Sequence, residues 1–242
     1  MRSLLPDQIH IWQGAISDAQ ASVPAFETLL SADERTRAAR FRFQRDRDCY
    51  VVSRGILRQL LAQYCGSEAD RIRFDYGAQG KPALAEGGAG GLQFNVSHSG
   101  DRILFAFALE LPVGVDVEYM QSNVDFAGLA RSSFSPTERD RLVALDLEHR
   151  AGLFYEYWTC KEACIKGDGR GLSVPLSEFS IVPSRRGAQW REVITTSDRI
   201  FPAAWSVRII ETSSGYAAAV AAAGHSWDIV ELNLGSPTDS KN

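Results

Sequence analysis

The sequence predicts an α+β fold made of two similar lobes, each with helices packed on an antiparallel sheet. In both halves of the 242 residues, helical patterns are followed by a run of strand-like segments, which is typical of α+β proteins. A break at Leu111–Gly114 separates the halves, and the length suffices for two hydrophobic cores. We therefore expect lobes at residues 1–112 and 113–234, an active site in the cleft between them, and a disordered polar tail at 235–242.

The first half is predicted to begin with one strand, continue with helices and end in strands. Ser31 and Glu34 have the spacing of a capping box, so a helix begins there. Tyr50–Leu61 is strongly apolar and predicts a buried helix, whereas glycine and proline in Gly77–Pro82 predict a turn. The expected strands are Ile9–Trp12, Ile72–Tyr76, Leu92–Ser97 and Arg102–Leu109, with a short helical stretch through Phe26–Leu30.

The second half is predicted to contain one long central helix together with further helices and strands. Apolar residues recur at helical spacing from about Arg150, and Gly167 ends the pattern after Lys166. Ser135, followed by proline and then Glu138, predicts the start of the preceding helix. The other expected segments are a strand at Val113–Glu118, a short helix at Asp125–Arg131, and strands at Phe179–Val182, Ala204–Ile210, Tyr216–Ala223 and Asp228–Leu232.

Composition is that of an ordinary globular protein and excludes several classes. Hydrophobic residues make up 45% and charged residues 23% of the chain, and the net charge is −4, which argues against a general nucleic-acid-binding protein. No apolar run has the length of a signal peptide or a membrane span. We expect a cytoplasmic protein that binds neither nucleic acid nor membrane. The four cysteines lack metal-site spacing and are expected to be free thiols.

One segment is strongly basic despite the acidic total. Between Arg35 and Arg58 there are eight arginines and only two acidic residues. Such a run is typical of a solvated helix face. It also suits an anion site, because the guanidinium group matches pairs of phosphate oxygens.

Asp116 and Glu118 alternate with apolar residues in the strand Val113–Glu118. Their side chains therefore point to the same face, as two carboxylates that share one cation must. The alternative is the solvent-facing side of an edge strand. His98, which follows Ser97 at the end of another strand, is either a phosphate donor or a turn residue bonded to the backbone.

Trp158, Glu162 and Lys166 are spaced four residues apart on the central helix and share one face. Glu162 and Lys166 form either a surface ion pair, which contributes only ~0.3–0.5 kcal/mol, or part of a site that holds a metal and a phosphate together. Trp158 packs beneath such a site or contacts its substrate.

Four motifs together resemble the 4′-phosphopantetheinyl transferase superfamily, in particular its larger two-lobed (Sfp-type) group. They occur in one order between about residues 31 and 182, and their combination is highly specific. They are Gly-Lys-Pro at 80–82, Phe-Asn-Val-Ser-His-Ser-Gly at 94–100, Gly-Val-Asp-Val-Glu at 114–118, and Phe-Tyr-x-x-Trp-x-x-Lys-Glu-x-x-x-Lys at 154–166.

The resemblance implies a magnesium-dependent transfer of the 4′-phosphopantetheine arm of coenzyme A to a serine of an apo acyl or peptidyl carrier protein, with release of 3′,5′-ADP. Such enzymes activate carrier proteins of peptide and polyketide synthases. Asp116, Glu118 and Glu162 are then the implied metal ligands. Lys166 is the implied pyrophosphate-binding residue, and Glu162 is also the candidate base. Two fused lobes supply the cleft internally, so we expect a monomer.

The coenzyme A contacts implied by the resemblance are Arg45, Lys81, Ser97, His98 and Lys166. Some relatives have a lysine where this chain has Glu34, and the neighbouring arginines Arg37 and Arg40 are candidates to replace it. Two other functions stay open. One is a non-catalytic module that binds coenzyme A or carrier protein, and the other is a metal-dependent phosphohydrolase.

Overall fold

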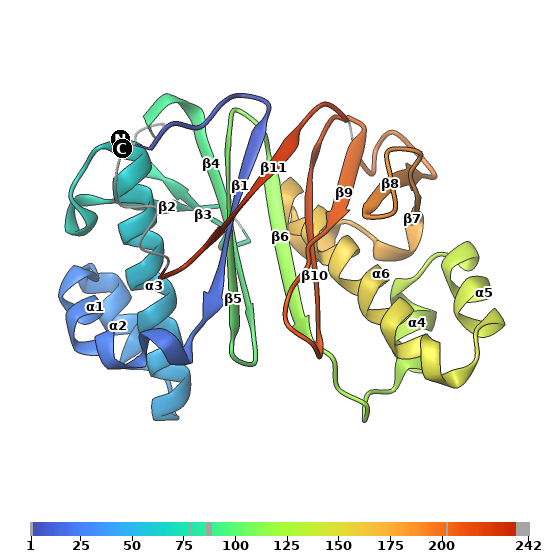
Figure 1. The fold of residues 1–242 in the computed structure, drawn as a ribbon, viewed down its shortest axis with the longest axis horizontal. Coiled ribbons are helices and arrows are strands. Elements are labelled where there is room, and N and C mark those ends of the chain that lie inside the picture. Colours follow the sequence, from blue (N-terminus) through green and yellow to red (C-terminus); the bar gives the residue numbers. More distant parts are fainter. Residues whose placement is uncertain (1, 78, 86–88, 202, 236–242) are drawn as a thin grey trace.

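The computed structural model describes residues 2–77, 79–85, 89–201 and 203–235, so the predicted tail at 235–242 lies almost entirely outside the described residues. Figure 1 shows two sheets side by side in the middle of the molecule, with helices on the outer side of each. One sheet has the strand order β11-β1-β5-β4, and the other has the order β6-β10-β9-β8-β7. The predicted α+β class with helices on largely antiparallel sheets is confirmed.

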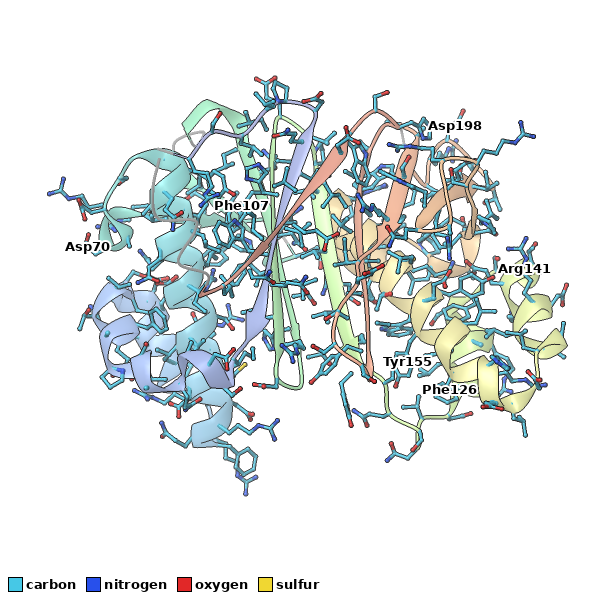
Figure 2. All side chains as sticks on the ribbon, viewed as in Figure 1. Asp70, Phe107, Phe126, Arg141, Tyr155 and Asp198 are labelled. Atoms are coloured by element: carbon cyan, nitrogen blue, oxygen red, sulfur yellow. The ribbon has the colours of Figure 1, made fainter. Side chains whose placement is uncertain are left out.

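The first lobe has three helices on the outer side of its sheet. Glu34 accepts a hydrogen bond from the backbone N of Ser31 at 3.0 Å, which completes the predicted capping box. Figure 2 shows Phe107 between α3 and the sheet, where it is fully buried. The elements of this lobe are β1 (Gln8–Ala15), α1 (Val23–Leu29), α2 (Ala32–Ala38), α3 (Gln44–Cys65), β2 (Phe74–Tyr76), β3 (Pro82–Leu84), β4 (Leu92–Ser99) and β5 (Arg102–Leu109).

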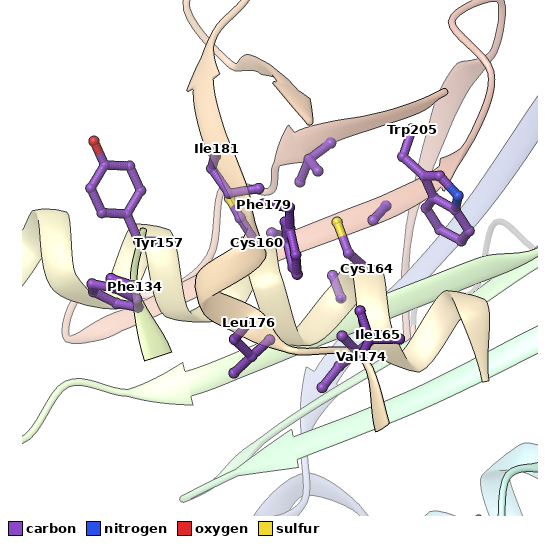
Figure 3. Close-up of a cluster of buried hydrophobic side chains, with 14 of the residues drawn as sticks. Phe134, Tyr157, Cys160, Cys164, Ile165, Val174, Leu176, Phe179, Ile181 and Trp205 are labelled. Carbon is purple, nitrogen blue, oxygen red and sulfur yellow. The ribbon is translucent and has the colours of Figure 1, made fainter. Parts of the chain in front are cut away.

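The second lobe is organised around its longest helix. Figure 3 shows side chains of this helix, including Cys160 and Cys164, in a core with Phe179 and Trp205. Both cysteines are free and fully buried. The elements are β6 (Val113–Tyr119), α4 (Phe126–Ser133), α5 (Pro136–Ala144), α6 (Leu147–Asp168), β7 (Phe179–Pro183), β8 (Trp190–Thr195), β9 (Trp205–Ile209), β10 (Tyr216–Ala223) and β11 (Asp228–Asn233).

The last strand departs from the predicted lobe range 113–234. Strand β11 crosses back to the first sheet and pairs with β1 in parallel, from Gln8 with Asp228 to Gln13 with Asn233. The first sheet is therefore not purely antiparallel, and it contains both the first and the last strand of the described chain. Strands β3 and β8 were not predicted, and α6 begins at Leu147, three residues before the expected start.

An apolar layer fills the space between the two sheets. Ile11 and Leu104 from the first sheet and Val115, Val117 and Val220 from the second belong to one buried cluster. Strand β6 is consequently buried on both faces. A functional site between the lobes must therefore lie at the junction of β4, β6 and α6, because the facing sheet surfaces are occupied by packed side chains. No helix within the described ranges is long and apolar enough to cross a bilayer.

Candidate active site

Helix α6 lies directly on β6 because the strand has a glycine where the two backbones meet. A Cβ atom on Gly114 would collide with backbone atoms of Ala163 and Gly167. Asp116 and Glu118 occupy the next alternate positions, so their side chains leave the strand on the same face as Gly114. The close approach therefore turns both carboxylates toward α6.

The ammonium group of Lys166 reaches from α6 to this strand face. Its Nζ lies 2.5 Å from Oδ1 of Asp116 and 2.9 Å from Oγ of Ser97. Asp116 is only 2% exposed, which excludes a solvent-facing edge strand. Burial raises the pKa of Asp116 to about 6, and the ammonium of Lys166 opposes that shift. Its other oxygen, Oδ2, is buried without a hydrogen-bond partner among the described residues.

Glu118 and Glu162 lie beside this pair. Oε2 of Glu118 accepts the hydroxyl of Ser99 at 2.8 Å. Burial raises the pKa of Glu162, and the nearby charges of Asp116 and Glu118 raise it further. Because each carboxylate influences the pKa of Glu162, the three predicted metal ligands are in one region. The predicted Glu162–Lys166 surface pair is not found within the described part of the chain, where Lys166 pairs with Asp116.

The donor chemistry of this region fits a hard cation such as Mg²⁺. Magnesium prefers oxygen ligands and is usually held by one or two carboxylates together with phosphate and water. The unpartnered Oδ2 of Asp116 is an available ligand. In the described ranges, no group of three or more His, Cys, Asp or Glu side chains is already arranged around a metal position. The residues thus suit an ion completed by phosphate and water, and the full ligand set remains a prediction.

Two predicted coenzyme A contacts, Lys81 and His98, lie near this centre, and a third, Arg45, lies on helix α3. Nζ of Lys81 donates to the carbonyl of Gly167 at 2.9 Å, at the end of α6, and burial lowers its pKa to about 8. Nδ1 of His98 lies 3.8 Å from Sγ of Cys49, and burial lowers the pKa of this histidine. Arg45 is exposed one helical turn before Cys49 on α3 and shares its face.

The arginines of the basic segment fall into two groups: some form buried ion pairs, and others line a groove. Glu34 is buried and pairs with Arg58 at 2.8 Å and with Arg54 at 3.6 Å, so these three side chains hold α2 against α3. Two other arginines line a groove beside them, which has a volume of about 820 Å³. Its lining is Asp33, Thr36, Arg37, Arg40, Phe41, Tyr50, Tyr76 and Gly80.

Comparison with known proteins identifies the family. A profile described as "4′-phosphopantetheinyl transferase superfamily" matches residues 112–221, and one described as "4′-phosphopantetheinyl transferase, N-terminal" matches residues 17–109. The 4′-phosphopantetheinyl transferase HetI of a Nostoc species is 34% identical over 227 residues, which cover 93% of this chain and 92% of that protein. The chain belongs to the 4′-phosphopantetheinyl transferase superfamily.

Two further similarities were found, one to a curated protein and one to a solved structure. The 4′-phosphopantetheinyl transferase Sfp of Bacillus subtilis is 29% identical over 198 residues, which cover 82% of this chain and 84% of Sfp. Among solved structures, a holo-(acyl-carrier-protein) synthase from Bacillus anthracis in complex with CoA (3′,5′-ADP) aligns at a TM-score of 0.39 and 17% identity, covering 47% of this chain and 96% of that one. The predicted family and its Sfp-type group are confirmed.

Sequence reasoning missed several residues of the candidate site and of the groove beside it. Ser99 was visible within the Ser-His-Ser motif, but its bond to Glu118 depends on the approach of two separate sheets. Tyr50 and Tyr76 join the arginine groove from elements far apart in the sequence. Only the motif spacing of Ser99 was a usable signal, because the others depend on tertiary packing.

Proposed function

We propose that this protein transfers the 4′-phosphopantetheine arm of coenzyme A to a serine of an apo acyl or peptidyl carrier protein, with Mg²⁺, and releases 3′,5′-ADP. The observation that supports the proposal is the ion pair of Lys166 with Asp116, close enough to Glu118 and Glu162 for their charges to interact, in a member of this superfamily. Clustered carboxylates beside an ammonium group suit a reaction at a pyrophosphate, where negative charge must be neutralised.

Each residue has a distinct part in this proposal. Asp116, Glu118 and Glu162 would hold Mg²⁺, which when bound would neutralise pyrophosphate charge. Lys166 has a side chain that is 32% exposed, so it can bind a pyrophosphate oxygen while staying near Asp116. Glu162 accepts no hydrogen bond from any described residue. It is therefore the carboxylate best able to take the proton of the carrier serine, whose hydroxyl is otherwise a weak nucleophile.

The nucleotide end would lie along the first lobe. Lys81, Ser97 and His98 border the centre, and Arg45 lies on the neighbouring face of α3. The groove lined by Arg37 and Arg40 offers guanidinium groups beside aromatic rings, which suits a phosphate next to a purine. The negative charge of Glu34 would not repel an anion in this groove, because Arg58 and Arg54 neutralise it.

The decisive experiment combines the recombinant protein, coenzyme A and Mg²⁺ with a panel of apo acyl and peptidyl carrier proteins. We expect a mass increase on one carrier serine and an equal amount of 3′,5′-ADP. Omission of Mg²⁺ should stop the reaction. Release of 3′,5′-ADP without carrier would identify a phosphohydrolase instead, and coenzyme A binding without turnover on any carrier would identify a binding module.

Loss of one contact to the nucleotide end of coenzyme A should weaken coenzyme A binding more than it slows the transfer step. We expect Lys81→Ala and Arg45→Ala to raise the KM for coenzyme A about tenfold, with kcat partly retained, because one charged hydrogen bond contributes ~1.5–3 kcal/mol. Steady-state kinetics with saturating carrier measure this. Arg139→Ala, an arginine on the outer helix α5, is the control. A fall in kcat at unchanged KM would remove the residue from the coenzyme A contacts.

A further inference from the structure

The two sheets meet along a ladder made of side chains. Strand β4 is the edge of the first sheet and β6 is the edge of the second, and the two exchange no backbone ladder. Three alternate backbone N–H groups of β6 instead donate to side chains of β4. Val115 N donates to Oδ1 of Asn95 at 2.9 Å, Val117 N to Oγ of Ser97 at 3.3 Å, and Tyr119 N to Oγ of Ser99 at 3.0 Å.

The two serines of this ladder also donate hydrogen bonds to carboxylates of the candidate active site. Ser97 donates to Oδ1 of Asp116 at 2.9 Å, and Ser99 donates to Oε2 of Glu118 at 2.8 Å. A hydroxyl has one proton to give and lone pairs to accept with. Each serine therefore accepts from the backbone of β6 and donates to a carboxylate of the same strand, so its hydroxyl orientation is fixed from both sides.

Ser99 is easier to test than Ser97, because its hydroxyl has fewer hydrogen-bond partners. Ser97 also accepts from Nζ of Lys166 at 2.9 Å, so replacing it would disturb the ammonium group as well. Among the described residues, the hydroxyl of Ser99 has hydrogen bonds only with Tyr119 N and Glu118. Glu118 accepts no other hydrogen bond from the described residues. The orientation of this carboxylate on its strand thus depends on one hydroxyl that the opposite lobe supplies.

We propose that Ser99 is a positioning residue: its hydroxyl holds the carboxylate of Glu118 in the orientation that binds the metal, and so makes the metal site depend on the packing of the two lobes. The proposal rests on the proposed function, in which Glu118 is a metal ligand. Partners that orient a metal ligand typically change metal affinity 10–100-fold when they are removed.

The test compares Ser99→Ala with Ser99→Thr, which keeps a hydroxyl, and with Ser184→Ala. Ser184 directly follows β7 and donates to Oε1 of Glu192 in β8 at 2.8 Å, so its loss removes the same type of bond away from the site. Binding of Mn²⁺ in the presence of coenzyme A is followed by the electron paramagnetic resonance signal of the free ion. Hydrogen exchange of the Tyr119 amide is measured in the metal-free protein.

We expect Ser99→Ala to raise the Kd for Mn²⁺ at least tenfold and to speed exchange of the Tyr119 amide. Ser184→Ala should leave both as in the unmodified protein, and Ser99→Thr should restore most of the Mn²⁺ affinity. An unchanged Kd in Ser99→Ala, or an equal change in Ser184→Ala, would overturn the inference about Ser99 but not the proposed function. If the unmodified protein binds no Mn²⁺ with coenzyme A, both this inference and the proposed metal dependence fail.

Discussion

Glu162→Gln and Asp116→Ala are each expected to lower kcat for carrier modification by about 10²–10⁴-fold. Glutamine cannot take a proton from the carrier serine, and alanine at residue 116 removes the oxygen that Lys166 pairs with and the unpartnered Oδ2. Intact-mass kinetics at saturating coenzyme A, carrier and Mg²⁺ measure the effect.

Two controls accompany these variants. Glu148→Gln changes an exposed glutamate in the first turn of α6, the helix that carries Glu162, and should leave turnover unchanged. Circular dichroism checks that each variant is folded. Turnover within a few-fold of the unmodified protein for either Glu162→Gln or Asp116→Ala would exclude that residue from the chemistry.

Lys161→Met is expected to lower the free energy of unfolding by about 3–5 kcal/mol. Nζ of Lys161 lies 2.9 Å from Oε2 of Glu138, and both side chains are 1% exposed. The same Nζ donates to the carbonyls of Leu176 and Phe179 at 2.6 Å each. Without Lys161, a buried carboxylate and two buried carbonyls lose their shared partner.

Urea unfolding measures the change, and two further variants show its cause. Lys166→Met removes an ammonium group from the same helix, but from a position that is 32% exposed, so it should cost much less stability. Adding Glu138→Gln to Lys161→Met should recover part of the loss, because the amide carries no charge and its oxygen can still accept from Ile181 N. Equal losses in Lys161→Met and Lys166→Met would contradict this explanation.

Local signals in the sequence were sufficient for most of the helices and strands and for part of the site. Ser31 and Ser135 begin helices as their capping patterns predict. Alternation in β6 placed Asp116 and Glu118 on one face, and helical spacing placed Glu162 and Lys166 on another. These relations hold within single elements, where backbone geometry alone decides which side chains are neighbours.

Contacts between distant elements were beyond local reasoning. Lys166 pairs with Asp116 rather than Glu162 because α6 approaches β6 at Gly114, a packing detail that spacing does not contain. Glu34 has the sequence signature of a cap, yet its larger role is a buried pair with Arg58. Strand β8 mixes charged and apolar residues and has no buried residue, so it lacks the alternation by which strands are predicted.

The parallel pairing of β11 with β1 has a consequence for the order of folding. During synthesis, β1 emerges early, whereas its neighbour β11 follows the whole second lobe. Until then β1 pairs only with β5, and its other edge offers unpaired N–H and C=O groups. Contacts so distant in sequence form slowly. The nascent first lobe is thus a sheet with an open edge, and pairing of β11 with β1 closes this edge last.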